Sequence, residues 1–260
     1  FGLNIFKAND YETVGLFKNS YFFGSSPITW DKYYPKANVK KLGGKTITQT
    51  IFEGEFRFDI FDEYSDYEKY LELKRKYLTS ISKPTLFYTH NATPGHSGLS
   101  GKCDPEENSR YFEGMKKANI EMKNDVLNIL SNDPDPIIVL LSDHGPSLTK
   151  NCRELRGYDL STIDKYDLQD RYGTFLSIHW PKKFNNIEQN VVITQDIFPL
   201  ILANITNNKN IFQELKVERK FFDRYKNNVN GINVINGIIT DGKDKGQPLF
   251  EIRSYQLPTK

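Results

Sequence analysis

The feature that most constrains the fold is a run of five apolar residues at 137–141 (IIVLL), bounded by Pro136 and Ser142. A short continuous apolar run of this kind is typical of a strand buried on both faces of a parallel sheet. A second strand is expected at 84–89 and a helix at 109–131. Strand, helix and strand at this spacing predict a βαβ unit.

Further elements extend this pattern along the chain. Apolar residues at spacings of three and four predict a helix over 62–80, which Asp62 or Ser65 could cap. The remaining segments expected to be regular are a helix end at 1–9, strands at 12–17, 174–180, 234–239 and 250–255, and a helix at 191–204. We therefore expect a three-layer α/β/α domain with a mostly parallel central sheet. Residues 1–206 should form its core, and residues 207–260 a C-terminal extension packed on the same domain.

Composition excludes several classes of protein. Hydrophobic residues make up 38% of the 260 positions and aromatic residues 13%, which predicts a packed core and argues against a disordered chain. The 35 basic and 33 acidic residues leave a net charge of +2, so a dedicated nucleic-acid binder is disfavoured. No apolar run of about 18 residues is present to span a membrane. Because the chain opens on Phe1 with no start Met, we expect it to be a piece of a longer protein.

Three of the four histidines lie in loops that follow two of the predicted strands. His90 and His96 belong to the first loop, and His144 follows Asp143 in the second. Ligands of open α/β sheets collect at the carboxyl ends of the strands, and a carboxylate beside an imidazole suits Zn²⁺, Mn²⁺ or a similar divalent cation. Gly145 would let the backbone approach a ligand closely. The alternative is an ordinary turn, since Asp caps turns and Gly accepts positive φ.

The order of these pieces resembles a known family. It runs from a strand with His-x(5)-His-Ser-Gly, through a long helix, to IIVLLSDHGPSL, then to residues 170–181 and 195–202. Over residues 10–205 the chain resembles the alkaline phosphatase/sulfatase superfamily. The nearest branch is the sulfatase-like one that includes phosphoethanolamine transferases and lipoteichoic acid synthases.

The resemblance implies roles for particular residues. Asp143 and His144 would be ligands of a divalent metal cation, without distinction between Zn, Mn, Mg and Ca. His96 would contact the phosphoryl or sulfuryl group of an ester substrate, or bind a second metal ion. His90 would contact substrate or, alternatively, only orient its turn. His179 lies inside a predicted strand, and we expect it to be structural.

The resemblance also has a gap. The family places its nucleophile, a Ser, Thr or modified Cys, and another acidic metal ligand ahead of the segment matching residues 1–17. The sulfatase nucleophile signature, Cys-x-Pro-x-Arg, is absent from this sequence. The expected activity is therefore that of a longer enzyme: a hydrolase if water resolves the covalent intermediate, or a transferase if an alcohol does. Its phosphate- or sulfate-ester substrate could be lipid- or glycan-linked. The alternative is a non-catalytic descendant that binds a ligand or partner. A nucleotide-binding protein is disfavoured because GxGxxG and GxxxxGK[ST] are both missing.

The two cysteines bear on the compartment. Cys103 lies seven residues beyond His96, and Cys152 lies eight beyond His144. Two loops that share a rim can bring the Cα atoms within the roughly 4.4–6.8 Å that a disulfide requires. Such a bond is expected outside the cytosol, in agreement with the resemblance, whose branches work at the outer face of a membrane behind an N-terminal anchor. The alternative is a pair of unrelated thiols in a cytosolic protein.

Overall fold

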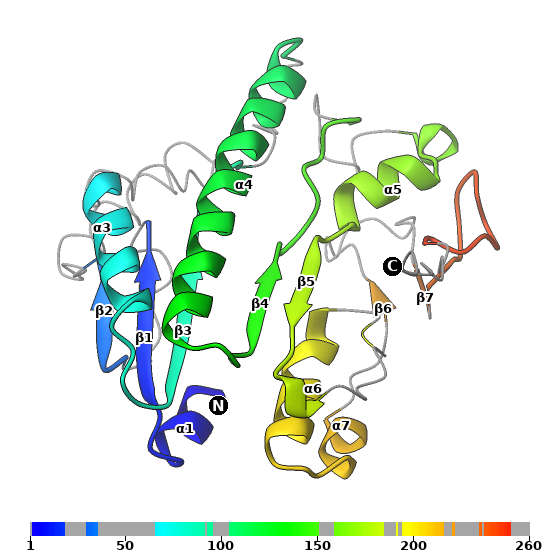
Figure 1. Cartoon of the computed structure of the whole chain (residues 1–260). Helices are drawn as coiled ribbons and strands as arrows, with labels where there is room; N and C mark the ends of the chain where they lie inside the picture. Colours follow the sequence, from blue (N-terminus) through cyan, green and yellow to red (C-terminus); the bar gives the residue numbers. More distant parts are fainter. Residues whose placement is uncertain are drawn as a thin grey trace, which may run out of the picture. The chain divides into compact units, whose positions relative to one another are not determined.

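The computed structural model describes residues 2–18, 30–35, 66–91, 93–95, 104–150, 159–184, 191, 194–215, 220–221, 234–235 and 237–250. The chain is a mixed α/β protein (Figure 1). It divides into two compact units, each described by itself. Unit 1 comprises Phe1–Thr93 and Lys116–Pro136, and unit 2 comprises Pro94–Met115 and Ile137–Lys260. The domain boundary expected at residue 206 stays a prediction.

Unit 1 is built on a parallel three-stranded sheet. The central strand is β1 (Glu12–Phe17), which lies between β2 (Lys32–Tyr34) and β3 (Thr85–His90). The short helix α1 (Gly2–Lys7) precedes β1. The strands predicted at 12–17 and 84–89 are thus confirmed, the second displaced by one residue, and the parallel α/β character is confirmed for this sheet.

Alternating residues of β1 face opposite sides of the sheet, as the two-residue period of a strand requires. Val14 and Leu16 are buried in one core cluster with Tyr70. On the other side, the indole of Trp30 lies against Gly15, where an added Cβ would sit 2.7 Å from the ring. Glycine at the centre of the strand is therefore needed for packing.

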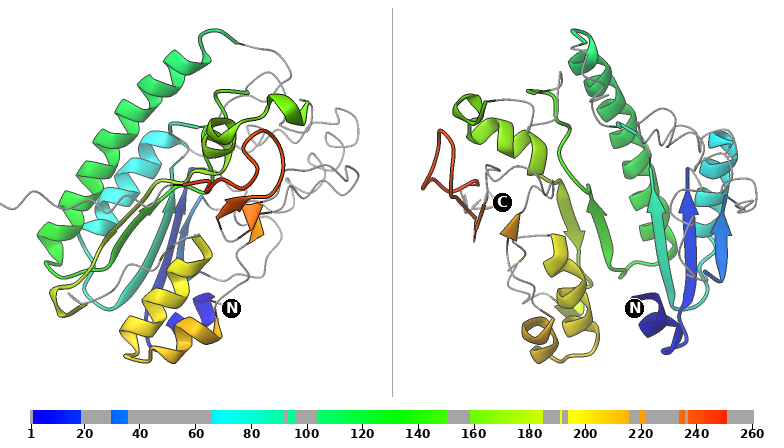
Figure 2. Two further views of the ribbon diagram at one scale, coloured as in Figure 1. Left: turned by 90° about the vertical axis from the view of Figure 1, so that its right-hand side faces the viewer. Right: turned by 180° about the vertical axis from the view of Figure 1, so that it is seen from behind.

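Two helices cover one face of this sheet. They are α3 (Tyr67–Leu78) and the C-terminal part of α4 (Glu107–Asn132), which lie on the same side of the strands (Figures 1 and 2). Asp66 caps α3 by accepting hydrogen bonds from the backbone N–H groups of Glu68 and Lys69. The prediction of Asp62 or Ser65 as the cap is wrong, because a cap must stand just ahead of the first helical turn to reach those groups.

The long helix is close to the predicted span, but its apolar stripe is not buried throughout. Phe112 is 56% exposed and Met115 is 36% exposed, whereas Ala118 is buried.

Among the described residues, no helix is long and apolar enough to cross a membrane.

Unit 2 contains the apolar run as β4 (Ile138–Leu141), paired with β5 (Leu176–His179). The pair is antiparallel, with Leu141 opposite Leu176, and Leu141 is 46% exposed. The prediction that this run is a doubly buried strand of a parallel sheet is therefore wrong for this pairing. The chain re-enters at the end where β4 leaves, so β5 runs back without a crossover. An apolar run alone carries no information on strand direction.

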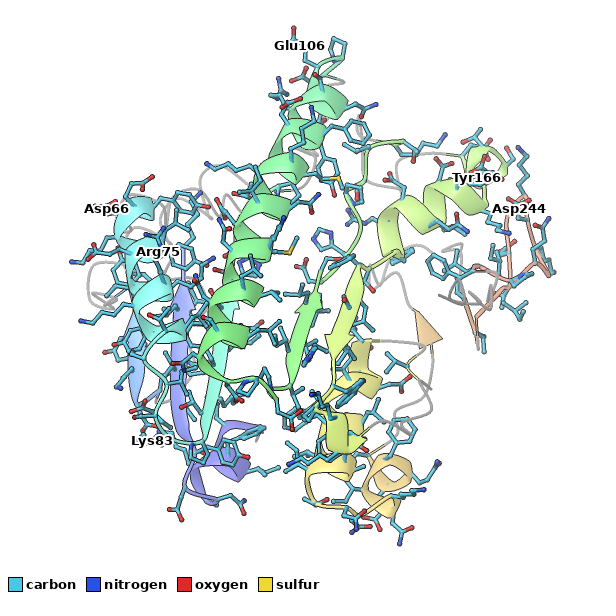
Figure 3. All side chains as sticks on the ribbon, viewed as in Figure 1. Asp66, Arg75, Lys83, Glu106, Tyr166 and Asp244 are labelled. Carbon is cyan, nitrogen blue, oxygen red and sulfur yellow. The ribbon has the colours of Figure 1, made fainter. Side chains whose placement is uncertain are left out.

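Unit 2 also contains α5 (Lys165–Tyr172), a helix absent from the sequence predictions. The backbone N–H of Lys165 donates to a carboxylate oxygen of Asp244 at 2.6 Å, and Figure 3 labels Asp244 near Tyr166 at the start of α5. A small core joins α5 and the residue ahead of its cap to the C-terminal segment, through Ile163, Leu168, Val234, Ile239 and Leu249. The other described elements are η4 (Leu160–Thr162), η5 (Lys182–Phe184), η6 (Thr194–Asp196), α6 (Ile197–Ile205), α7 (Asn210–Glu214), and the antiparallel β6 (Lys220–Phe221), β7 (Val234–Ile235) and β8 (Ile238–Ile239).

Candidate metal centre

Asp143 and His144 follow β4 directly, at a point that the backbone fixes. Ser142 continues the β4–β5 pairing by one step: its N–H donates to the carbonyl of Phe175 at 3.0 Å, and its hydroxyl accepts from the N–H of Phe175 at 2.8 Å. Asp143 is thus the first residue beyond the sheet. Its position is set by the strand, as the sequence predicts.

The backbone after His144 docks on the C-terminal end of α5. The N–H of Gly145 donates to the carbonyl of Arg171 at 3.0 Å, and the N–H of Ser147 donates to the carbonyl of Asp170 at 3.2 Å. The last carbonyls of a helix have no partner within the helix, so this contact satisfies two of them. A Cβ at Gly145 would lie 2.0 Å from the carbonyl oxygen of Asp170. Glycine is therefore required here by the contact with the helix, and the expectation that it lets the backbone approach a ligand stays a prediction.

Side chains strengthen the same contact. Arg171 donates to the hydroxyl of the buried Ser147 at 2.7 Å. The carboxylate of Asp170 accepts from the N–H and the hydroxyl of Thr149, at 2.8 and 3.1 Å. The end of α5 thus holds residues 145–149 through both backbone and side-chain hydrogen bonds.

Sequence reasoning missed α5, although a signal for it was present. Asp164 and Asp167 form a reciprocal capping box at its start, and Gly173 follows its last residue. Acidic residues three apart followed by a glycine are typical of a short helix with marked ends. The weak apolar pattern of KYDLQDRY hid that signal.

The ring of His144 has a defined tautomer. Its Nδ1 lies 2.7 Å from the carbonyl oxygen of Gly145. A carbonyl oxygen only accepts hydrogen bonds, so Nδ1 carries the proton and Nε2 of the neutral ring carries the lone pair. Metal-binding histidines are commonly fixed in this way, with one ring nitrogen donating to a carbonyl and the other facing the cation.

The second ring nitrogen of His144 lies beside a carboxylate. Its Nε2 is 3.7 Å from Oδ2 of Asp143, whose Oδ1 accepts from the backbone N–H of His144 at 3.1 Å. Zinc bonds of about 2.0–2.2 Å at a tetrahedral angle put two ligand atoms about 3.4 Å apart. The observed separation is close to that value, so this pair fits a shared divalent cation. The His144 side chain is 40% exposed and the Asp143 side chain is 75% exposed, so both are accessible to a cation or to further ligands.

The pair supplies two ligands. Within the described part of the chain, no cluster of three or more His, Cys, Asp or Glu side chains could hold a metal ion. Structural and catalytic zinc sites use three or four protein ligands. A complete centre would therefore need donors from elsewhere.

The other predicted site residues are distributed as follows. His90 ends β3 in unit 1, opposite Phe17 of β1. His179 ends β5 in unit 2, opposite Ile138, and is exposed. The proximity expected between the His90 loop and the Asp143 loop stays a prediction, because the two belong to different units. His96, Cys103 and Cys152 lie outside the described residues.

Comparison with known proteins adds no relative to this description: no family model, no curated protein and no solved structure matches the chain.

Proposed function

We propose that this chain is part of a metal-dependent hydrolase or transferase that acts on phosphate or sulfate esters, with the three-layer fold of the alkaline phosphatase/sulfatase superfamily. The observation that supports this proposal best is the pairing of Asp143 Oδ2 with His144 Nε2 across 3.7 Å, directly after a strand. The sequence resemblance gives the reaction class, and the pairing gives a geometry in which two donors can share one cation.

The residues of this chain would have distinct tasks. Asp143 would hold the cation through one carboxylate oxygen, and His144 would hold it through Nε2 while Nδ1 stays bound to the Gly145 carbonyl. When bound, a divalent cation neutralises negative charge on an ester oxygen. According to the family resemblance, His96 would make the main contact with the ester and His90 a secondary one. No residue of this chain is assigned as the nucleophile.

The proposal is tested with the protein in any form that also carries the nucleophile. Asp143→Asn and His144→Ala should each abolish both the bound metal and the turnover of p-nitrophenyl phosphate or sulfate. Glu214→Gln, at an exposed acid on α7, is the matched control and should change neither. Bound metal without turnover of either ester would favour the non-catalytic descendant, and full turnover in either site variant would refute the cation site.

The proposed compartment is extracytoplasmic, with the protein anchored in a membrane through a segment other than this chain. A disulfide between Cys103 and Cys152 would support it, because such bonds persist outside the cytosol. The test is titration of thiols in the denatured, unreduced protein. No reactive thiol is the expected result, and two would remove the disulfide and with it this argument for the compartment.

A further inference from the structure

A buried polar layer lies between α3 and α4, above the end of β3 in unit 1. From α3 it receives Tyr67, Tyr70 and Lys74, which the helical period places on one face. From α4 it receives Glu121 and Asp125. Lys74 forms an ion pair with Asp125 at 2.7 Å, and the hydroxyl of Tyr67 donates to Oε1 of Glu121 at 2.6 Å. Burial, with the bond to Glu121, raises the pKa of Tyr67 to about 12, so this hydroxyl keeps its proton.

This layer holds the first residue after β3. The ammonium group of Lys74 donates to Oδ1 of Asn91 at 3.3 Å, and the hydroxyl of Tyr70 donates to the same oxygen. The single proton of Tyr70 is thereby used, so the hydroxyl of Thr89 is the donor in its 2.7 Å contact with Tyr70. Lysine can only donate, so the atom of Asn91 that faces the layer is the oxygen.

The orientation of Asn91 has a chemical consequence. Its amide oxygen is turned toward the helices, so its N–H₂ group is turned away from them. Asn91 is half-buried, and α3 fixes the side chain from which those N–H bonds project. Two N–H donors held in a fixed direction at the carboxyl end of a parallel strand form a ready binding group for an oxygen acceptor.

Positive charge gathers at the same edge of the sheet. Phe17 and His90 are the last paired residues of β1 and β3, so Lys18 and Asn91 each follow directly beyond that pair. The ammonium groups of Lys18 and Lys117 lie 5.9 and 5.1 Å from the centre of the Tyr67 ring.

The lysines around the polar layer outnumber its carboxylates. Asp125 is paired with Lys74, whereas Glu121 accepts the Tyr67 hydroxyl through one oxygen and keeps its negative charge. Lys18, Lys74 and Lys117 against Asp125 and Glu121 leave one positive charge, which favours an anion.

We propose that Asn91 is a ligand-binding residue, whose amide N–H₂ group binds an oxyanion of the phosphate or sulfate class at the carboxyl edge of this sheet. Lys18 and Lys117 attract the anion, and Tyr70 and Lys74 are positioning residues that orient the amide. The proposal goes beyond the proposed function: it depends on unit 1 alone and does not require the cation pair of unit 2. A negative result for one therefore leaves the other standing.

The test uses the whole chain labelled with [¹⁵N]asparagine, titrated with inorganic phosphate and, separately, with sulfate at constant ionic strength. Asn91→Asp identifies the side-chain amide signal of Asn91 by removing it. Aspartate keeps an acceptor oxygen toward Lys74 and Tyr70, so the fold is retained while the donor is lost. We expect a saturable shift of the Asn91 signal with at least one of the two anions, and no such shift with chloride. In Asn91→Asp, anion affinity measured by calorimetry should fall at least about tenfold, because the hydrogen bond to the anion is lost and a negative charge takes its place.

Two further variants separate positioning from structure. Lys74→Met combined with Asp125→Leu removes both charges together and should leave the backbone spectrum folded, yet lower anion affinity up to about tenfold because Tyr70 alone then orients the amide. Lys117→Gln should weaken binding about two- to fivefold. Asn119→Asp, at an exposed position of α4, should have no effect. An Asn91 signal that moves no more with phosphate or sulfate than with chloride would overturn the proposal, as would wild-type affinity in Asn91→Asp.

Discussion

The ammonium group of Lys74 lies 2.7 Å from a carboxylate oxygen of Asp125, and the Lys74 side chain is only 2% exposed. Burial raises the pKa of the Asp125 carboxyl, and the hydrogen bond from Lys74 opposes that rise. Neither group would be stable at this depth as an isolated charge, so the two residues act as a unit that joins α3 to α4.

Removing one partner of this ion pair should be costly. Lys74→Met leaves a largely buried carboxylate without its cation and should lower the free energy of unfolding by about 3–5 kcal/mol. Lys74→Met with Asp125→Leu should recover most of that loss, because no charge is then left unpaired. Urea denaturation measures both effects. Lys76→Met, on the exposed side of α3, is the control; a single Lys74 variant as stable as this control would refute the coupling.

The contact between Asp31 and the start of β1 predicts a dependence on pH. Lys7 donates to this carboxylate at 2.9 Å, and the N–H and hydroxyl of Thr13 each donate to it at 2.8 Å. These bonds lower the pKa of Asp31 from 3.8 to about 2. Because the folded value is depressed, the stabilisation is complete above the unfolded pKa and is lost as pH falls from about 4 toward 2.

The measurement compares the unfolding free energies of the wild type and Asp31→Asn across pH. The difference should be constant above pH 5, where Asp31 is ionised in both states, and should shrink toward pH 2. A difference that is unchanged between pH 5 and pH 2 would show that the carboxylate charge contributes nothing.

The docking of Gly145 on α5 predicts a local effect of a single methyl group. In Gly145→Ala the new Cβ would meet the carbonyl oxygen of Asp170, which is backbone and cannot rotate away. We expect a loss of at least about 2 kcal/mol in unfolding free energy and reduced hydrogen-exchange protection at the Ser147 amide. Gly246→Ala is the control for backbone strain, since Gly246 has φ of +86° and nothing within 4 Å of an added Cβ. It should leave the Ser147 amide protected; equal loss of protection in both variants would contradict the docking.

The start of α5 depends on its capping box. Asp164→Ala removes the oxygen that accepts from the N–H groups of Tyr166 and Asp167, at 2.9 and 3.1 Å. The expected cost is about 1 kcal/mol. Asp164→Asn keeps an acceptor oxygen that caps about as well, so it should lower the unfolding free energy by only a few tenths of a kcal/mol. Similar losses for the two variants, measured by urea denaturation, would indicate that charge and not capping is responsible.

The sequence predicts part of this fold well and part of it poorly. Strands at 12–17 and 84–89 and the helix at 62–80 are found because their local patterns of apolar residues match their packing. The helix at 109–131 is found as well, although Phe112 and Met115 of its apolar stripe are exposed. The antiparallel pairing of the apolar strand at 137–141 with β5 is not predicted, since it depends on where α5 returns the chain. The packing of Gly145 is missed for the same reason: it contacts a helix 25 residues further along the chain.

Some features of the candidate site can be predicted from the sequence and others cannot. The adjacency of Asp143 and His144 is covalent, so their closeness follows from the sequence, whereas the 3.7 Å approach of Oδ2 to Nε2 depends on the side-chain conformations. The tautomer of His144 depends on the backbone conformation at Gly145, and the orientation of Asn91 depends on side chains from α3. Neither can be inferred from a motif, because each is fixed by contacts between separate segments.

The central claim is that Asp143 and His144 share a divalent cation. Its most direct test is paramagnetic broadening of histidine ring signals by substoichiometric Mn²⁺. His144 should broaden first and most strongly, and Asp143→Asn should abolish this selectivity. His179 is the internal control, since it is also exposed in unit 2 but stands between Ile178 and Trp180, away from any neighbouring carboxylate in sequence. The account predicts strong broadening of His144 with His179 little affected. Equal broadening of the two rings, or undiminished broadening of His144 in Asp143→Asn, would contradict it.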